Sequence, residues 1–128
     1  MSAIRFSCTS WSGAIKKGNS NLSKIGGILI KHIVMWSMKK DSDLALKIGN
    51  AMEVKRRLES LKPNIFEIKK FEVGVNFSNS LSAYDIVLYS EFKNREDLAH
   101  YMGHPKHVIV KEYIDNVTGD HHVVDYEI

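Results

Sequence analysis

The first strong pattern of hydrophobic and polar positions begins at residue 28. The run Ile28–Met38 is rich in β-branched and aromatic residues and alternates with a period of two, which predicts a strand. One side of the alternation carries Ile33 and Met35, and the other carries His32, Val34, Trp36 and Met38. Because both sides are largely apolar, we expect both faces of this strand to be buried.

A helical pattern follows this strand. Asp41 or Ser42 is expected to cap the N-terminus of the helix, and Pro63 is expected to end it. Apolar residues recur at helical spacing and predict the buried face of the helix, which would consist of Leu44, Ile48, Ala51, Met52, Leu58 and Leu61.

Two further strands and a turn are predicted in the middle of the chain. Phe71–Phe77 alternates without a break, and Tyr84–Phe92 forms a second apolar run. The polar stretch Ser78–Ser82 lies between them and is typical of a turn. These three segments therefore predict a β-hairpin.

The last part of the chain predicts a broken helix and a final strand. Asn94 is a good cap for a first helix, and Gly103 with Pro105 interrupts that helix. Pro105 suits the first position of a second helix, which His104 would cap. After the turn at residues 119–120, His122–Ile128 is expected to form a strand.

The predicted order is that of a ferredoxin-like fold. If the last two helices are one crossover broken at Pro105, the chain reads βαββαβ, an α+β plan with four antiparallel strands. Helices cover only one face of such a sheet, so the face that carries Ile33 and Met35 needs a partner. A homodimer that packs through this sheet face is the simplest solution.

Composition and charge indicate a single globular domain and exclude several other classes of protein. The chain has 128 residues, enough for one domain, and its 44% hydrophobic content is typical of a globular protein. Its single cysteine, Cys8, excludes an internal disulfide and a multi-Cys zinc site. Residues 1–28 hold four of the 18 basic residues and none of the 15 acidic ones, so the remainder has 14 basic and 15 acidic residues. This balance predicts neither nucleic-acid nor membrane binding, and we expect a cytoplasmic protein.

The segment 1–28 differs from the rest of the chain. It is rich in Ser, Gly, Asn and Lys, and its large apolar residues follow no steady period. It contains no apolar core of the kind found in secretory signals. We therefore interpret residues 1–28 as an N-terminal extension, flexible or not native, and residues 29–128 as the folded domain.

Five strings in order carry a resemblance to a known family. They are Ile30-Lys31-His32-Ile33-Val34-Met35-Trp36, Phe71-Glu72-Val73-Gly74-Val75-Asn76-Phe77, Tyr84-Asp85-Ile86-Val87-Leu88, Tyr101-Met102-Gly103-His104-Pro105-Lys106-His107 and Val123-Val124-Asp125-Tyr126-Glu127. In this spacing the chain closely resembles the stress-responsive alpha/beta-barrel (Dabb) family over about residues 29–128. The resemblance implies a dimeric alpha-beta barrel with the helices outside. Members typically have Met directly before the first string, where this chain has Leu29, so Leu29 is a candidate for the native start.

One branch of that family consists of plant polyketide cyclases such as olivetolic acid cyclase. The resemblance to this branch implies a set of catalytic residues. The matching positions are Tyr101 and His107, with His32 in the pocket, while Asp85 replaces a histidine of those cyclases. In an aldol closure, His107 could remove a proton next to a carbonyl and Tyr101 could donate to the developing oxyanion. The enzyme alternative is thus a small cofactor-independent lyase or cyclase. In the structural alternative, these side chains only pack the helix break against the sheet.

The sequence favours non-catalytic binding over catalysis. A pocket between helices and sheet would suit a small apolar or aromatic ligand and would require no cofactor. Its expected lining is Trp36, Asp85, Phe92, Tyr101, His104 and Val108.

Two other functions are weakly supported. His100 and His104 have the i, i+4 spacing of a chelating pair, but no cysteine or well-placed carboxylate completes a set, so no metal is expected. Trp36 and Asn76 are available for the chemistry of cofactor-free monooxygenases that share this plan, but only by analogy of fold.

Overall fold

The computed structural model describes residues 28–40 and 42–128. Its elements are β1 (Ile30–Met38), α2 (Leu44–Glu59), β2 (Ile68–Val75), β3 (Ile86–Phe92), α3 (Arg95–Gly103), α4 (Pro105–Val117) and β4 (Thr118–Glu127). The order confirms the expected α+β, ferredoxin-like plan with a second crossover divided into two helices. The interpretation of the N-terminal extension concerns residues that, apart from Ile28, lie outside the described ranges.

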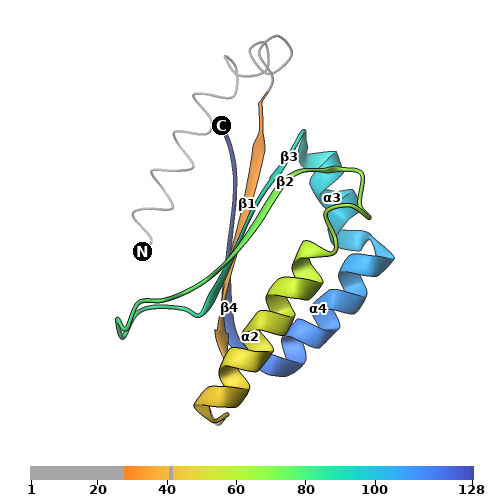
Figure 1. Cartoon of the computed structure of the whole chain (residues 1–128). Coiled ribbons are helices and arrows are strands. Elements are labelled where there is room, and N and C mark those ends of the chain that lie inside the picture. Colours follow the sequence, from red (N-terminus) through yellow and green to blue (C-terminus); the bar gives the residue numbers. More distant parts are fainter. Residues whose placement is uncertain (1–27, 41) are drawn as a thin grey trace.

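The four strands form one antiparallel sheet in the order β2-β3-β1-β4. Strand β1 lies in the interior of the sheet, where Met35 is the partner of Val87 on β3 and of His122 on β4. All three helices lie on one side of the sheet, as Figure 1 shows. Among the described residues, the helices therefore cover one face of the sheet and leave the other face, called the open face below, uncovered.

The alternation of β1 divides its side chains between these two faces. His32, Val34 and Trp36 are buried on the helix-covered face, whereas Met35 on the open face is 37% exposed. For the described residues of the single chain, the expected burial of both faces is therefore wrong, because none of their helices lies over the odd-numbered positions of β1.

Helix α2 begins and ends at different residues than expected. Its buried face also differs from the predicted one. Its cap is Asp43 instead of Asp41 or Ser42, because the Asp43 carboxylate accepts a hydrogen bond from the Leu46 amide at 2.8 Å. The helix ends at Glu59, before Pro63. Ala51 and Leu58 are buried as predicted, together with Val54, but Leu44, Ile48 and Met52 are more than half exposed. Apolar residues lie on two sides of this helix, and only one side packs on the sheet.

The break between α3 and α4 is built as the sequence predicts. The Asn94 side chain accepts from the Asp97 amide at 2.8 Å and caps α3. The His104 side chain accepts from the Lys106 amide at 3.1 Å and caps α4, whose first residue is Pro105. The crossover therefore changes direction at residue 104.

The remaining strands are shifted relative to the sequence pattern. Strand β2 starts at Ile68 and stops at Val75, β3 starts at Ile86, and β4 already starts at Thr118. Phe77 was expected in a strand but lies beyond β2 and is 97% exposed. Backbone pairing with the neighbouring strand determines where each of these strands begins and ends. The apolar pattern alone does not show this pairing. Within the described ranges, no helix has the length and apolar character needed to cross a bilayer.

Candidate ligand-binding cavity

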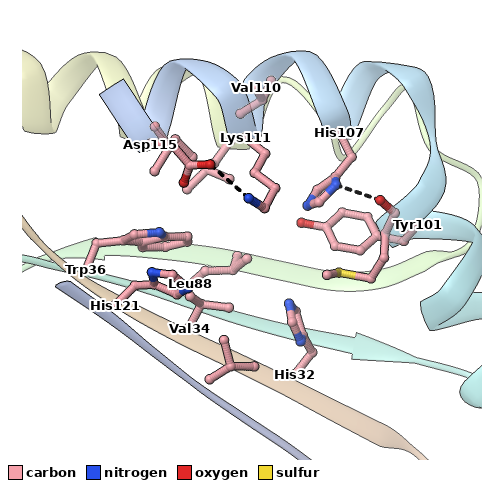
Figure 2. A pocket seen from close by; sticks show the side chains of 14 residues that line it. His32, Val34, Trp36, Leu88, Tyr101, His107, Val110, Lys111, Asp115 and His121 are labelled. Atoms are coloured by element: carbon pink, nitrogen blue, oxygen red, sulfur yellow. Dashed lines mark hydrogen bonds and ion pairs between the residues drawn. The ribbon is translucent and has the colours of Figure 1, made fainter. Parts of the chain in front are cut away.

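A cavity of about 130 Å³ lies between α4 and the helix-covered face of the sheet (Figure 2). Its walls are mostly apolar and come from Val34, Trp36, Leu58, Leu88, Val110 and Ile114. Three polar side chains, Tyr101, His107 and His32, are buried at one end. The exposed side chains of Lys111, Asp115 and His121 form the other end, the mouth. The cavity thus has an apolar body, a buried polar end and a solvent-exposed mouth.

Tyr101 is fully buried but its hydroxyl has no hydrogen-bond partner. The residue belongs to the last part of α3, and its ring packs at a centroid distance of 5.0 Å from Phe92 and 5.9 Å from Phe71. Figure 2 shows the hydroxyl pointing into the space below α4. Burial raises the pKa of this phenol well above its usual range, so the hydroxyl keeps its proton and remains a donor.

His107 lies beside Tyr101 in the first part of α4. Its Nδ1 donates to the Met102 carbonyl oxygen at 3.0 Å, so in the neutral ring Nε2 retains its lone pair. Burial lowers the pKa of His107, which favours this neutral form. The ring centroids of Tyr101 and His107 are 4.4 Å apart. The helix break at Pro105 makes this contact possible, since positions six apart on a continuous helix face different directions.

His32 reaches the same end of the cavity from the sheet. It is 2% exposed, and its ring lies at 6.0 Å from that of Tyr101 in an edge-on arrangement. Its Nδ1 is 2.5 Å from a carboxylate oxygen of Asp125, its register partner on β4. The carboxylate can only accept here, so Nδ1 donates and the orientation of the ring is fixed from outside the cavity.

The other residues expected to bind a ligand are in different places. Trp36 lines the cavity, but Phe92, Asp85, His104 and Val108 do not. Phe92 is completely buried against Tyr101, and Val108 is 42% exposed on α4. Asp85 accepts from the Met38 amide at 2.6 Å, and His104 caps α4. None of these four side chains therefore lines the cavity: Phe92, Asp85 and His104 have structural contacts elsewhere, and Val108 is exposed.

Three polar residues at the mouth were not predicted. Lys111 and Asp115 form an ion pair at 2.8 Å on α4, and His121 lies near Trp36 in Figure 2. Extending the helix from His107 in steps of four residues leads to Lys111 and Asp115. That spacing was available in the sequence, whereas the position of His121 depends on the start of β4.

The histidines do not gather into a metal site. His100 is largely exposed and lies 3.5 Å from Glu67, while His104 is used as a helix cap. In the part of the chain that the structure describes, no three His, Cys, Asp or Glu side chains come together in a way that could hold a metal ion.

Comparison with known proteins relates this chain to a family. A profile of the stress-responsive A/B barrel domain matches residues 30–128. A stress-response A/B barrel domain-containing protein of Arabidopsis thaliana is 28% identical in an alignment of 106 positions that covers 77% of this chain and 36% of that protein. The chain therefore spans about a third of the length of this relative.

Solved structures show the same fold. A dimeric protein of unknown function with a ferredoxin-like fold from Bacteroides fragilis is 33% identical, with a TM-score of 0.73 over 78% of this chain and 96% of that one. A hydroxynitrile lyase from Passiflora edulis is 16% identical, with a TM-score of 0.60 over 78% of this chain and 93% of the lyase. At that identity, the likeness to the lyase extends to the fold alone.

Proposed function

The chain belongs to the stress-responsive A/B barrel domain family, and we propose that it is a homodimer that binds a small, largely apolar ligand in the cavity beneath α4. One observation carries the proposed ligand binding, namely the buried Tyr101 hydroxyl without a hydrogen-bond partner. Leaving such a group unpaired costs about 1–3 kcal/mol. A ligand oxygen that accepts from Tyr101 would offset this cost, so the cavity favours an apolar molecule with one polar atom.

The dimensions of the cavity limit the ligand further. A dry apolar cavity of about 150 Å³ accommodates one benzene molecule, and the volume here is about 130 Å³. A single ring or a short branched chain would therefore fill the apolar body, with its oxygen next to Tyr101. Any longer substituent would extend past Lys111 toward solvent.

The homodimer is proposed from the open face of the sheet. Met35, Val87 and Val124 are all more than a third exposed there. They occupy neighbouring positions on β1, β3 and β4, so they form one apolar surface. The related Bacteroides fragilis protein is dimeric, and pairing of two open faces would remove this surface from water.

Two probes of nearly equal shape test the binding site. Acetophenone carries a carbonyl oxygen, and α-methylstyrene has a methylene group in its place. We expect the wild-type protein to bind acetophenone about tenfold more tightly than α-methylstyrene, because only the ketone accepts a hydrogen bond from Tyr101. In Tyr101→Phe this preference should vanish while α-methylstyrene still binds, as measured by titration calorimetry. Equal binding of both probes by the wild-type protein would refute the role of Tyr101.

Catalysis in the same cavity is a second candidate, and the geometry of His107 favours it. Its neutral ring has a free Nε2 next to a protonated phenol, which is the arrangement required for proton abstraction beside a carbonyl. Such a pair would serve a cofactor-independent lyase or cyclase reaction, in which Tyr101 donates to the enolate oxygen while His107 accepts the proton.

Exchange of the acetophenone methyl protons in D₂O tests this second candidate without knowledge of the natural substrate. The wild-type protein should accelerate the exchange at least a hundredfold more than His107→Ala does, a typical effect of a positioned base. His100→Ala is the matched control and should exchange like the wild type, because His100 is an exposed histidine of α3 that does not line the cavity. Binding without accelerated exchange would leave ligand binding as the function and exclude His107 as a base toward such ketones.

A further inference from the structure

The β2–β3 hairpin continues beyond the paired strands as an arm, residues 76–85. Two of its side chains are fully exposed, Phe77 at 97% and Leu81 at 105%. Residues 76–84 contain no charged side chain, although charged residues make up 26% of the whole chain. Large exposed apolar side chains and a lack of charge are features of the central part of a protein interface.

Internal hydrogen bonds give the arm a defined shape. The Asn76 amide donates to the Asp85 carbonyl oxygen at 2.8 Å and closes its base. Within it, the Asn76 side chain donates to the Ser78 carbonyl oxygen at 2.8 Å, and the Ala83 amide donates to that of Ser80 at 3.1 Å. A partner would therefore meet Phe77 and Leu81 on a pre-organised loop, which lowers the entropy cost of binding.

The direction of the arm indicates which molecule would cover its exposed side chains. Figure 1 shows the tip projecting past the end of the sheet, away from the layer of helices. The arm is thus continuous with β2 and β3 at the border of the open face, where Val87, the partner of Met35, is also more than a third exposed. In a two-fold dimer through the open face, a segment that projects on this side reaches toward the other protomer.

We propose that the arm packs against a second copy of this chain and contributes a large share of the dimer affinity. This inference rests on the proposed homodimer. Because of the two-fold symmetry, each dimer would bury two arms, and hence two copies each of Phe77 and Leu81. The arm would then act as a clasp at the border of the sheet-to-sheet contact.

Sedimentation velocity over a dilution series of the full chain tests the inference. The double variant Phe77→Ser/Leu81→Ser should raise the dimer Kd at least 100-fold, since four buried apolar side chains are lost per dimer. Phe66→Ser is the matched control: Phe66 is equally exposed at 97% but lies between α2 and β2, outside the arm. Its dimer Kd should change less than threefold. Circular dichroism should show the same secondary structure in all three proteins.

The outcomes separate this inference from the proposed function. A wild-type Kd in the double variant would overturn the clasp but leave the homodimer intact. A wild-type protein that stays monomeric at every concentration would overturn both. Hydrogen exchange provides a measurement without substitution: in the wild type, amides at 77–83 should be better protected in concentrated than in dilute protein. Equal protection at both concentrations, in a protein that does dimerise, would also overturn the clasp.

Discussion

The two faces of the sheet differ in how far the chain itself covers them. On the helix-covered face, Leu88 and Trp36 are buried, and among the described residues the Tyr101 hydroxyl is the only fully buried side-chain oxygen or nitrogen without a hydrogen-bond partner. On the open face, Met35 and Val87 stay more than a third exposed. The first face therefore leaves one buried donor without an acceptor, and the second leaves an apolar surface exposed. Strand β1 contributes to both, because its alternation sends His32 to the cavity and Met35 to the open face.

The largest effect is expected from a charge on the open face. Met35→Glu should raise the dimer Kd at least 1,000-fold, about 4 kcal/mol, because dimerisation would have to remove the carboxylate from water between two sheets. Ile109→Glu is the control, since Ile109 is 62% exposed on α4, on the helix side of the sheet. Sedimentation equilibrium measures both constants. A Met35→Glu dimer as tight as the wild type would place the interface elsewhere.

Two neighbouring residues of β3 sharpen the comparison between the faces. Leu88 is 1% exposed under the helices, so Leu88→Ala should lower the free energy of unfolding by about 3 kcal/mol. Val87→Ala, one position away on the open face, should cost less than about 1 kcal/mol when it is measured in the monomeric Met35→Glu background. Urea unfolding gives both values. Similar costs at the two positions would contradict the difference in coverage.

A smaller effect of opposite sign is expected in the cavity. Tyr101→Phe should raise the free energy of unfolding of the ligand-free protein by about 1 kcal/mol, because it deletes a buried hydroxyl that has no partner. Thermal and urea unfolding measure this change. A marked loss of stability would mean that the hydroxyl is bonded in the free protein, and would remove the reason to expect a ligand oxygen there.

The smallest effect concerns pH. The pKa of His107 lies below its ordinary value of 6.5 in the folded protein because of burial. As the pH falls below 6.5, the unfolded chain therefore takes up this proton first and the free energy of unfolding decreases. His107→Gln should make the decrease between about pH 7 and 5 shallower. Glu53 does not interfere, because hydrogen bonds from Arg56 and Arg57 hold its pKa at about 2, and its contribution is lost only below the ordinary value of 4.5. An unchanged slope in the variant would contradict the lowered pKa.

Local sequence patterns predicted those parts of the fold that depend on neighbouring residues. Asn94 and His104 cap their helices as expected, and Pro105 begins α4. The alternation of β1 also identified Met35 as a residue of the uncovered side. Helix α2 was predicted less well, because its apolar residues surround much of the helix. Which of them meet the sheet depends on tertiary packing, so Val54 is buried while Ile48 is exposed.

The cavity was predictable only in part, for a related reason. Tyr101, His107, His32 and Trp36 all line it, but the pattern could not show that the helix break brings the first two rings into contact. Phe92 is as apolar as a cavity residue should be, yet it lies behind Tyr101. Asp125, which holds His32, and His121 at the mouth depend on the register between β1 and β4. That register pairs segments far apart in the sequence, so the spacing of residues within one segment does not predict it.

Native mass spectrometry with added acetophenone tests the claims for both faces in one experiment, because it reports the oligomeric state and the number of bound acetophenone molecules together. We expect a wild-type dimer that binds up to two acetophenone molecules, and a Met35→Glu monomer that binds up to one. Tyr101→Phe should remain a dimer but should carry much less acetophenone at the same concentration. A monomeric wild-type protein would contradict the claim for the open face. A dimer that takes up no acetophenone, or takes up as much after Tyr101→Phe, would contradict the claim for the cavity.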